Sequence, residues 1–402
     1  METKLSNKWK EEPLSTYADV KGGNGFPLRF QEKDSDIAFL KVSDLGERDG
    51  DKSLAKAHYS ISKKNNEILK AKVYPANTII FAKIGAAVFL ERKRILNFDA
   101  CIDNNLAVIL PKLNIDVDFL YYLLANYDIS NHVTATALPS INIKDFLSST
   151  HMFPELPEQK VIAKVLSDID KMTSQLKLEK VKLENFKLAQ IYSLLNPKSL
   201  SQKGITTQKF LLSNIAIYSK GRGQNKSNIL PNGEYPCILY GELFTTYSEV
   251  IENVASKSSK HEGLSSISGD VLIPGSTTTV GRDLATASVI RENGILLGGD
   301  INIIRISDFR TLLPEYFAYL FKYILVDQVE QMAQGTTIKH LYGKEIIKLN
   351  INLPHIDYQT QVTEILSITE KRIRSVQAEL EKYDCIKQGM LHDLLARKVR
   401  LV

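Results

Sequence analysis

The stretch PELPEQKVIAKVLSDIDK (residues 154–171) has a counterpart 200 residues later, PHIDYQTQVTEILSITEK (residues 354–371). Five of the eighteen aligned positions are identical, among them the opening prolines and the glutamines Gln159 and Gln359. An internal repeat that is overlooked leads to a wrong fold assignment, so the similarity of these two stretches has to be followed along the chain before any element is assigned.

The repeat continues upstream through both halves of the chain. ATALPSINIKDF (135–146) aligns with GTTIKHLYGKEI (335–346), and DNNLAVI, which starts at Asp103, aligns with DINIIRI, which starts at Asp300. Further upstream, VKGGN near Gly22 resembles SKGRG near Gly221. The sequence therefore predicts two tandem copies of one plan.

Each copy changes character part of the way along. It begins with short β-branched runs separated by glycine and polar turns, which are typical of strands and hairpins. It then becomes helical in period and nearly free of glycine. We expect an α+β protein with two tandem globular domains, separated by two long antiparallel coiled-coil helices in a pseudo-twofold repeat. The predicted segments are a first domain (1–155), a first spacer helix (156–197), a second domain (198–354) and a second spacer helix (355–402).

The helices are predicted from a heptad pattern of apolar residues, which favours packing against another helix. The first is expected to begin at Pro157 and to end before Asn196-Pro197, and the second to run to about Lys398. The expected seam residues are Ile162, Val165, Ile169, Met172, Leu176, Leu183 and Phe186 in the first helix, and Leu366, Ile373, Val376, Leu380, Tyr383, Met390 and Leu394 in the second. The same seams would also serve a pairing between two molecules.

Composition excludes several classes of protein. The chain has 402 residues, of which 44% are hydrophobic and 24% charged, as in ordinary globular proteins, and a net charge of +5 that only permits a polyanionic partner. Its three cysteines form no CxxC pair, so neither a disulfide framework nor a zinc or other metal site is expected. The N-terminus has no apolar secretion segment and no run is apolar enough to span a bilayer, so we expect a cytoplasmic protein.

Three features of the sequence resemble a known family. They are the helix starts (Pro157-Glu158-Gln159 and residues 354–359), the helix ends LAQIYSLLN (188–196) and KQGMLHDLLARKVRL (387–401), and the twofold alternation of domain and helix. Over essentially its whole length the chain resembles the specificity subunits of type I restriction-modification systems. The resemblance implies two target-recognition domains that each read half of an interrupted double-stranded DNA site, and helices that set the gap. It also implies two methyltransferase subunits and restriction-translocase subunits as partners, no catalysis by this chain, and S-adenosylmethionine, ATP and magnesium bound only to those partners.

DNA reading requires cations for phosphates and amide or guanidinium groups for base edges. In the second domain the candidates lie in three loops: Lys220, Arg222, Gln224, Asn225 and Lys226; then Thr277, Thr278 and Arg282; and finally Thr336, Lys339 and His340. In the first domain they are Lys21, Asn24, Lys83, Arg92, Lys93, Arg94, Ser140, Asn142 and Lys144, with Thr136 beside them. Any of these can instead be an ordinary solvated or turn residue. Because the loops of the two copies differ, different half-sites are expected.

Two alternatives come from other classes of protein. An enzyme acting on DNA would show a glycine-rich cofactor loop, a phosphate loop or a catalytic tetrapeptide, none of which is present; Glu158-Gln159-Lys160 matches a nuclease triplet but falls at a helix start. A purely structural protein that dimerises through its helices would explain the seams, but it would leave the two glycine-looped domains without a role. A stand-alone structural coiled-coil protein that binds DNA without restriction-modification partners stays open as an alternative.

Overall fold

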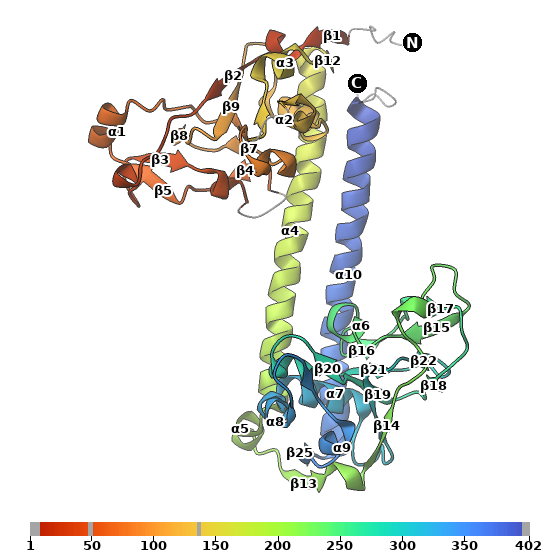
Figure 1. Ribbon diagram of the computed structural model, residues 1–402. Coiled ribbons are helices and arrows are strands. Elements are labelled where there is room, and N and C mark those ends of the chain that lie inside the picture. Colours follow the sequence, from red (N-terminus) through yellow and green to blue (C-terminus); the bar gives the residue numbers. More distant parts are fainter. Residues whose placement is uncertain (1–8, 47–50, 135–137, 396–402) are drawn as a thin grey trace, which may run out of the picture. The chain divides into compact units, whose positions relative to one another are not determined.

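The computed structural model describes residues 9–46, 51–134 and 138–395. The candidate Thr136 and the predicted helix end near Lys398 lie outside these residues. The contacts divide the chain into two compact units, one formed by residues 1–178 with 378–402 and the other by residues 179–377. Each unit holds one strand-rich domain and a part of each long helix (Figure 1).

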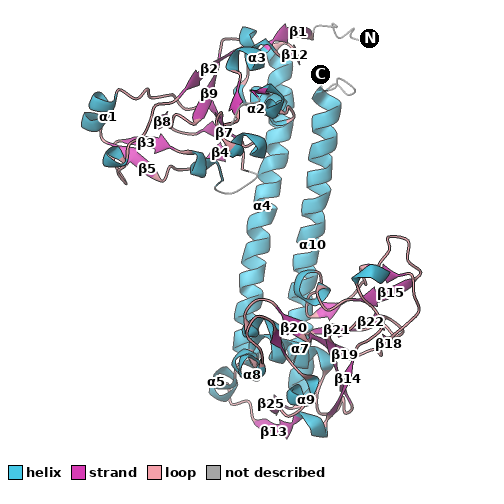
Figure 2. Cartoon of the chain, in the orientation of Figure 1, coloured by secondary structure: helices cyan, strands magenta, loops and turns pink. Residues whose placement is uncertain are grey.

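A five-stranded sheet forms the centre of the first domain, in the order β2-β9-β6-β7-β4 (Figure 2). These strands are β2 (Ala18–Gly22), β4 (Ser53–Leu54), β6 (Ile79–Ala82), β7 (Lys93–Leu96) and β9 (Leu106–Pro111). A second sheet has the order β5-β3-β8, with β3 (Ile37–Leu40), β5 (Tyr59–Ile61) and β8 (Ala100–Ile102). Two short pairs join β1 (Lys10–Pro13) to β12 (Thr150–Phe153) and β10 (Val133–Thr134) to β11 (Ser140–Ile141), and the helices are α1 (Lys63–Leu69), α2 (Val117–Ala125) and α3 (Ile143–Ser148).

The second domain is built on the same plan. Its five-stranded sheet has the order β14-β23-β19-β21-β16, with β14 (Ala216–Lys220), β16 (Val250–Ile251), β19 (Asp270–Pro274), β21 (Ser288–Ile290) and β23 (Ile301–Ile306). Its second sheet has the order β17-β15-β22-β18, with β15 (Tyr235–Ile238), β17 (Ser256–Ser258), β18 (Leu264–Ser265) and β22 (Leu296–Leu297). The remaining elements are the pairs β13 (Thr207–Leu211) with β25 (Asn350–Pro354) and β20 (Ser276–Thr277) with β24 (Lys339–His340), and the helices α5 (Pro197–Gln202), α6 (Glu242–Thr245), α7 (Pro314–Tyr323), α8 (Val326–Met332) and α9 (Gly343–Ile346).

The two five-stranded sheets agree in strand direction as well as in order. In each, the first four strands pair antiparallel and the short edge strand pairs parallel, β4 with β7 and β16 with β21. The central strands β6 and β19 are buried along their whole length, and their residues are apolar except Asp270, which pairs with Arg305 of β23. The predicted fold class, with its internal repeat, is therefore confirmed.

The long helices are α4 (Leu156–Leu195) and α10 (Ile356–Leu395), each of 40 residues. The last turn of α4 is followed by Asn196, whose side chain accepts a hydrogen bond from the backbone N–H of Lys198 (3.0 Å) and starts α5 with Pro197 in its first turn. A proline after the asparagine stops the preceding helix because it disfavours helical geometry at the residue before it. The four-part division of the chain by residue number stays a prediction.

The two helices run antiparallel within the second unit. Lys180 Nζ donates to Gln377 Oε1 (2.8 Å), and Lys187 Nζ contacts Glu370 Oε2 (2.5 Å), so rising numbers on α4 meet falling numbers on α10. Within the first unit, Lys387 Nζ of α10 lies 2.5 Å from Asp170 Oδ1 of α4. Polar pairs therefore occupy part of the seam between the helices.

On α4, the seam differs from the predicted one at alternate positions. Met172 and Phe186 are 42% and 55% exposed, so the prediction that they lie in the seam is wrong. Thr173 and Lys187, one residue further along, are buried instead. Adjacent residues of a helix point about 100° apart around its axis. The predicted and the observed heptad registers both contain Ile162, Ile169, Leu176 and Leu183, but they use different residues at the positions in between. The predicted α10 residues are buried or half-buried.

Candidate nucleic-acid interface

The predicted loops of the second domain meet on one side of its central sheet. Strands β20 and β24 pair, with Ser276 opposite His340 and Thr277 opposite Lys339, which joins the second predicted loop to the third. Lys220, at the end of β14, brings the first loop to the same place, since its Nζ lies 3.6 Å from Asp300 Oδ1. The Ser276 hydroxyl also donates to the Asp300 carboxylate. Three loops that are far apart in sequence therefore gather around Asp300.

The first domain assembles the corresponding loops. Ser140 pairs with Thr134 across β10 and β11 and also bridges to Ile84, which follows β6 as Ser276 follows β19. Lys83 lies beside Gly22 at the end of β2, because its Nζ is 2.6 Å from the position that a side-chain Cβ at Gly22 would take. The repeat thus places three equivalent loops together in each domain, although their residues differ.

Several of the predicted DNA-contacting residues are exposed to solvent. In the second domain they are Lys220, Arg222, Asn225, Lys226, Thr278 and Thr336, and in the first domain Lys21, Asn142 and Lys144. Two of the amides also cap local turns: Asn142 accepts from the backbone N–H of Asp145 (3.1 Å), and Asn225 accepts from that of Ser227 (3.0 Å). These caps hold each amide in a fixed position at the surface.

Other candidates contact neighbouring residues and are half-buried or, in the case of Thr277, buried. Asn24 accepts from the backbone N–H of Lys72 (3.2 Å), and Lys339 donates to the Gly335 carbonyl (2.5 Å). The His340 ring stacks near Tyr342, and the Thr277 hydroxyl bonds that of Thr279 (2.8 Å). These contacts show that the residues help to hold the loops in their conformation.

Arg282 is exposed but faces acidic residues of α8. Its guanidinium lies 3.0 Å from Asp327 and 3.2 Å from Glu330. Exposed pairs of this kind are weak, so a phosphate can compete for the guanidinium.

Gln224 was predicted to read adenine, and the structure contradicts this. Its side chain is 3% exposed, and its Nε2 donates to the carbonyls of Lys260 (2.9 Å) and Glu262 (2.6 Å). Its Oε1 accepts from the Ser258 hydroxyl (2.6 Å). An amide that already makes these bonds has no group left to pair with a base edge. Gln224 instead ties the first loop to the loop after β17.

The neighbouring glycines Gly221 and Gly223 are required by the packing and the conformation of the loop. A Cβ at Gly221 would lie 2.1 Å from the Gly298 carbonyl oxygen, and Gly223 has φ of 84°, which favours glycine. Close packing and backbone conformation therefore require glycine at these two positions.

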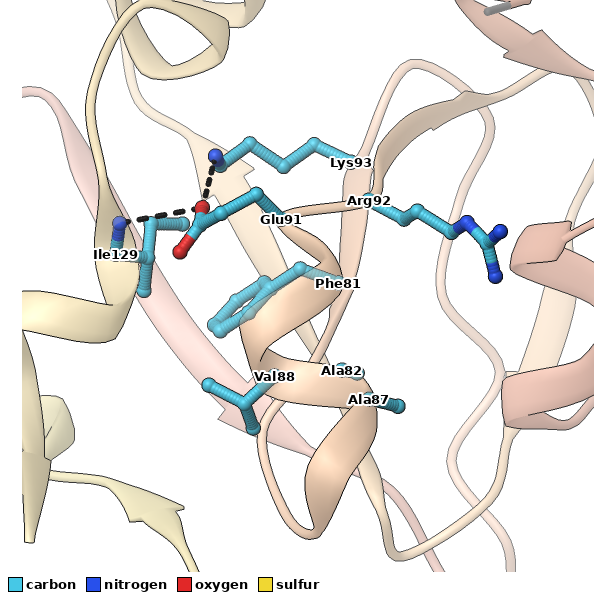
Figure 3. Close-up of a pocket in the computed structure, with 8 residues that line it drawn as sticks. All are labelled: Phe81, Ala82, Ala87, Val88, Glu91, Arg92, Lys93 and Ile129. Atoms are coloured by element: carbon cyan, nitrogen blue, oxygen red, sulfur yellow. Dashed lines mark hydrogen bonds and ion pairs between the residues drawn. The ribbon is translucent and has the colours of Figure 1, made fainter. Parts of the chain in front are cut away.

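Lys93 and Arg94 are buried in the first domain, so the prediction that they contact DNA is wrong. Lys93 Nζ bonds Glu91 (2.5 Å) and the Tyr127 carbonyl (3.0 Å), and burial lowers its pKa (Figure 3). Arg94 donates to the carbonyls of Lys93 (2.9 Å) and Leu45 (3.1 Å). Half-buried Arg92 points away from the Lys93–Glu91 pair. Strand β7 is buried along its whole length, which its run of like charges does not indicate.

The cavity beside Lys93 is too small to bind a ligand. It has room of about 10 Å³, roughly that of one water molecule.

Within residues 9–46, 51–134 and 138–395, no three His, Cys, Asp or Glu side chains are arranged to hold a metal ion. In the same part of the chain, no helix combines the length and apolarity needed to cross a membrane.

Tandem strand-rich domains that each gather lysine-, asparagine- and threonine-bearing loops define a protein that recognises nucleic acid in two parts. The family model described as Type I restriction modification DNA specificity domain matches the chain twice, over residues 7–185 and 205–382, and the chain belongs to this family. It is a non-catalytic DNA specificity subunit of the type I restriction-modification class, as the sequence predicted.

Relatives agree with this assignment. The chain is 22% identical over 342 residues to the type I restriction enzyme MjaVIII specificity subunit of Methanocaldococcus jannaschii, covering 78% of this chain and 76% of that protein. It is 23% identical over 323 residues to the putative type I restriction enzyme MjaX specificity subunit of the same organism, covering 74% and 72%. The solved S subunit of a type I restriction-modification system from M. genitalium shares the fold, with a TM-score of 0.63, 16% identity and 98% coverage of both chains. The structural-protein alternative has no support among them.

Proposed function

We propose that each domain binds one half of an interrupted double-stranded DNA site through the surface where its three loops meet. The observation that carries this proposal is the repeated convergence of loops around Asp300 and around Lys83. Cations on such a surface attract phosphates and set the register on the duplex, while amides and guanidinium groups read base edges.

The differences between the two surfaces favour two different half-sites. Ser276, Thr277 and Thr278 follow the central strand of the second domain, where the first has Ile84, Gly85 and Ala86. In the aligned first-domain loop, Gly23 and Pro27 stand opposite Arg222 and Lys226, so neither cation has a charged counterpart at its own position. Groups of different hydrogen-bonding capacity at equivalent positions read different bases.

The paired helices are proposed to dock two methyltransferase subunits, through which restriction-translocase subunits join. Support comes from α4, where Val181, Leu188 and Tyr192 are exposed at a spacing that places them on one face. Leu178, also exposed, continues the same spacing. An apolar helical stripe of this kind fits a groove or another helix. S-adenosylmethionine, ATP and magnesium are proposed to bind these partner subunits and not this chain.

The test is a genome-wide map of methylated adenines in the source cells with this gene intact and deleted. We expect one interrupted two-part motif to disappear on deletion. If every methylated motif persists while the partner methyltransferase is expressed and active, the proposal fails.

A further inference from the structure

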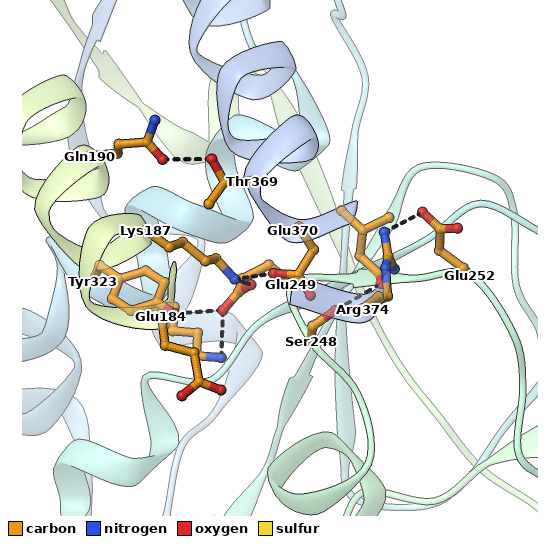
Figure 4. Close-up of polar contacts among 12 residues, drawn as sticks. Glu184, Lys187, Gln190, Ser248, Glu249, Glu252, Tyr323, Thr369, Glu370 and Arg374 are labelled. Atoms are coloured by element: carbon orange, nitrogen blue, oxygen red, sulfur yellow. Dashed lines mark hydrogen bonds and ion pairs between the residues drawn. The ribbon is translucent and has the colours of Figure 1, made fainter. Parts of the chain in front are cut away.

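A buried ionic cluster joins both long helices to the second domain. Lys187 of α4 is buried, and its Nζ contacts Glu370 Oε2 of α10 at 2.5 Å and Glu249 Oε2 of the domain at 2.6 Å (Figure 4). A single ammonium group therefore bridges two carboxylates that belong to different parts of the unit.

Glu249 is the centre of this cluster. It lies immediately before the edge strand β16, is 2% exposed, and also accepts from Lys322 Nζ (2.7 Å) and the Tyr323 hydroxyl (2.6 Å) at the end of α7. Burial would raise its pKa, but Lys322 and Lys187 outweigh burial and hold the pKa at about 2. Glu249 is therefore a carboxylate with two cations and one hydroxyl arranged around it.

The ionic cluster of Lys187, Glu249 and Glu370 tolerates less displacement of its side chains than an apolar contact would. Buried ion pairs contribute little net stability because their desolvation offsets their attraction, but they are strongly unfavourable when a partner is displaced. A sliding or tilting of the domain on the helices would separate Glu249 from Lys187. The cluster thus resists small changes of angle that apolar side chains would tolerate.

Among the residues that the structure describes, the first domain does not repeat this arrangement. Lys52 occupies the equivalent position before edge strand β4: its carbonyl accepts from Ile95 N (2.8 Å), as that of Glu249 accepts from Val289 N (2.9 Å). Lys52 Nζ donates to Ser167 (2.8 Å) and Asp118 (3.0 Å). A lysine cannot accept from Lys387, the counterpart of Lys187 in the repeat, so Lys52 cannot form the bridge that Glu249 forms in the second copy.

We propose that Lys187 is a positioning residue for DNA recognition, which fixes the angle of the second domain on the helices and thereby the gap length at which its half-site is read. This inference rests on the proposed function. Each added base pair moves a half-site by about 3.4 Å and turns it by roughly 35°, so a firmly held domain rejects a gap that is one base pair too long or too short. A loosely held domain would accept a gap of the wrong length while still reading the same bases.

The test compares variants in cells that lack the native gene and express its partner subunits. Lys187→Met removes the bridge, and Glu249→Gln keeps the shape of the side chain but removes its charge. Arg374→Met is the matched control, because the Arg374–Glu252 pair (3.0 Å) also joins α10 to the segment around β16 but is far more exposed. The measurement is the map of methylated adenines in genomic DNA, scored by gap length.

With both cluster variants we expect the two wild-type half-sites at the native gap and, in addition, a roughly tenfold rise in methylation at gaps one base pair longer or shorter. Arg374→Met should keep the single gap. The inference is overturned if both cluster variants methylate only the native gap, or if both lose methylation equally at all gaps, since the cluster would then act only in folding. If the wild-type chain itself yields no gene-dependent two-part motif, the proposed function fails first and this inference with it.

Discussion

Gln159 and Gln359, 200 positions apart, make the same three hydrogen bonds in their respective units. Each Oε1 accepts from the backbone N–H of the residue that caps a short helix, Asp116 at 2.8 Å and Leu313 at 3.1 Å. Each Nε2 donates to the proline carbonyl five residues earlier, at 2.9 and 3.0 Å. The third bond goes to Asn114 O (3.4 Å) or Thr311 O (2.9 Å). The glutamine that occurs in both repeats thus connects each domain to its own long helix through side-chain hydrogen bonds.

Replacing one of these glutamines should destabilise its own unit only. Gln159→Leu leaves the half-buried N–H of Asp116 without its acceptor, which is expected to reduce the free energy of unfolding of the first unit by about 2 kcal/mol. Trp9, the chain's only tryptophan, bonds Glu158 beside this site (3.1 Å), so its fluorescence reports on the first unit. Urea unfolding followed by this fluorescence should shift for Gln159→Leu and stay unchanged for Gln359→Leu.

The matched control for the second glutamine is Gln361→Leu, two residues along α10 and exposed. Circular dichroism of the whole chain should show an earlier transition for Gln359→Leu and none for Gln361→Leu. Equal effects of the two would show that the bonds of Gln359 do not matter.

Acid should weaken the second unit through Glu249. Its pKa of about 2 lies below its ordinary 4.5, so the ionised carboxylate stabilises the fold above about pH 4.5, and this contribution is lost as the pH falls toward 2. Glu249→Gln should lower the free energy of unfolding by roughly 3 kcal/mol at pH 7, and the difference from wild type should shrink steadily below pH 4.5. Thermal unfolding at several pH values measures this; a difference that stays constant down to pH 3 would contradict it.

Arg222 and Gln224 should behave differently although they are two residues apart. Arg222→Ala removes an exposed guanidinium and is expected to weaken binding or relax recognition at the second half-site by about 1–3 kcal/mol, with unchanged thermal stability. Gln224→Ala deletes buried hydrogen bonds and is expected to lower stability instead. Binding to duplexes that carry single substitutions in either half-site, alongside thermal unfolding, separates the two effects. Arg310→Ala, exposed outside the three loops, is the control.

The exposed face of α4 should matter for partners and not for folding. Leu188→Glu combined with Tyr192→Glu places charges on the apolar stripe and is expected to reduce co-purification of the methyltransferase subunits at least tenfold. Lys182→Glu, exposed elsewhere on the same helix, should have little effect. Loss of helical circular dichroism in the double variant would mean that this face supports the fold.

Local patterns in the sequence were sufficient for the architecture. The repeat of Gln159 and Gln359, the strand-like runs and the proline after Asn196 are features of neighbouring residues, and periodicity reports directly on helix and strand. The loops that converge around Asp300 were also identified, because glycine and polar turns mark connections between strands.

What the sequence by itself determined is the twofold plan, its elements and the loops proposed to recognise DNA, since these follow from local periodicity and turn chemistry. The tertiary structure decided which side chains those elements bury. Gln224, Lys93 and Arg94 carry DNA-reading chemistry but are held by residues distant in sequence. Lys187 lies in the helix seam in place of Phe186 because Glu370 and Glu249, 183 and 62 residues away, compensate its charge. A buried polar group is stable only beside its partners, and those partners meet only in the folded chain.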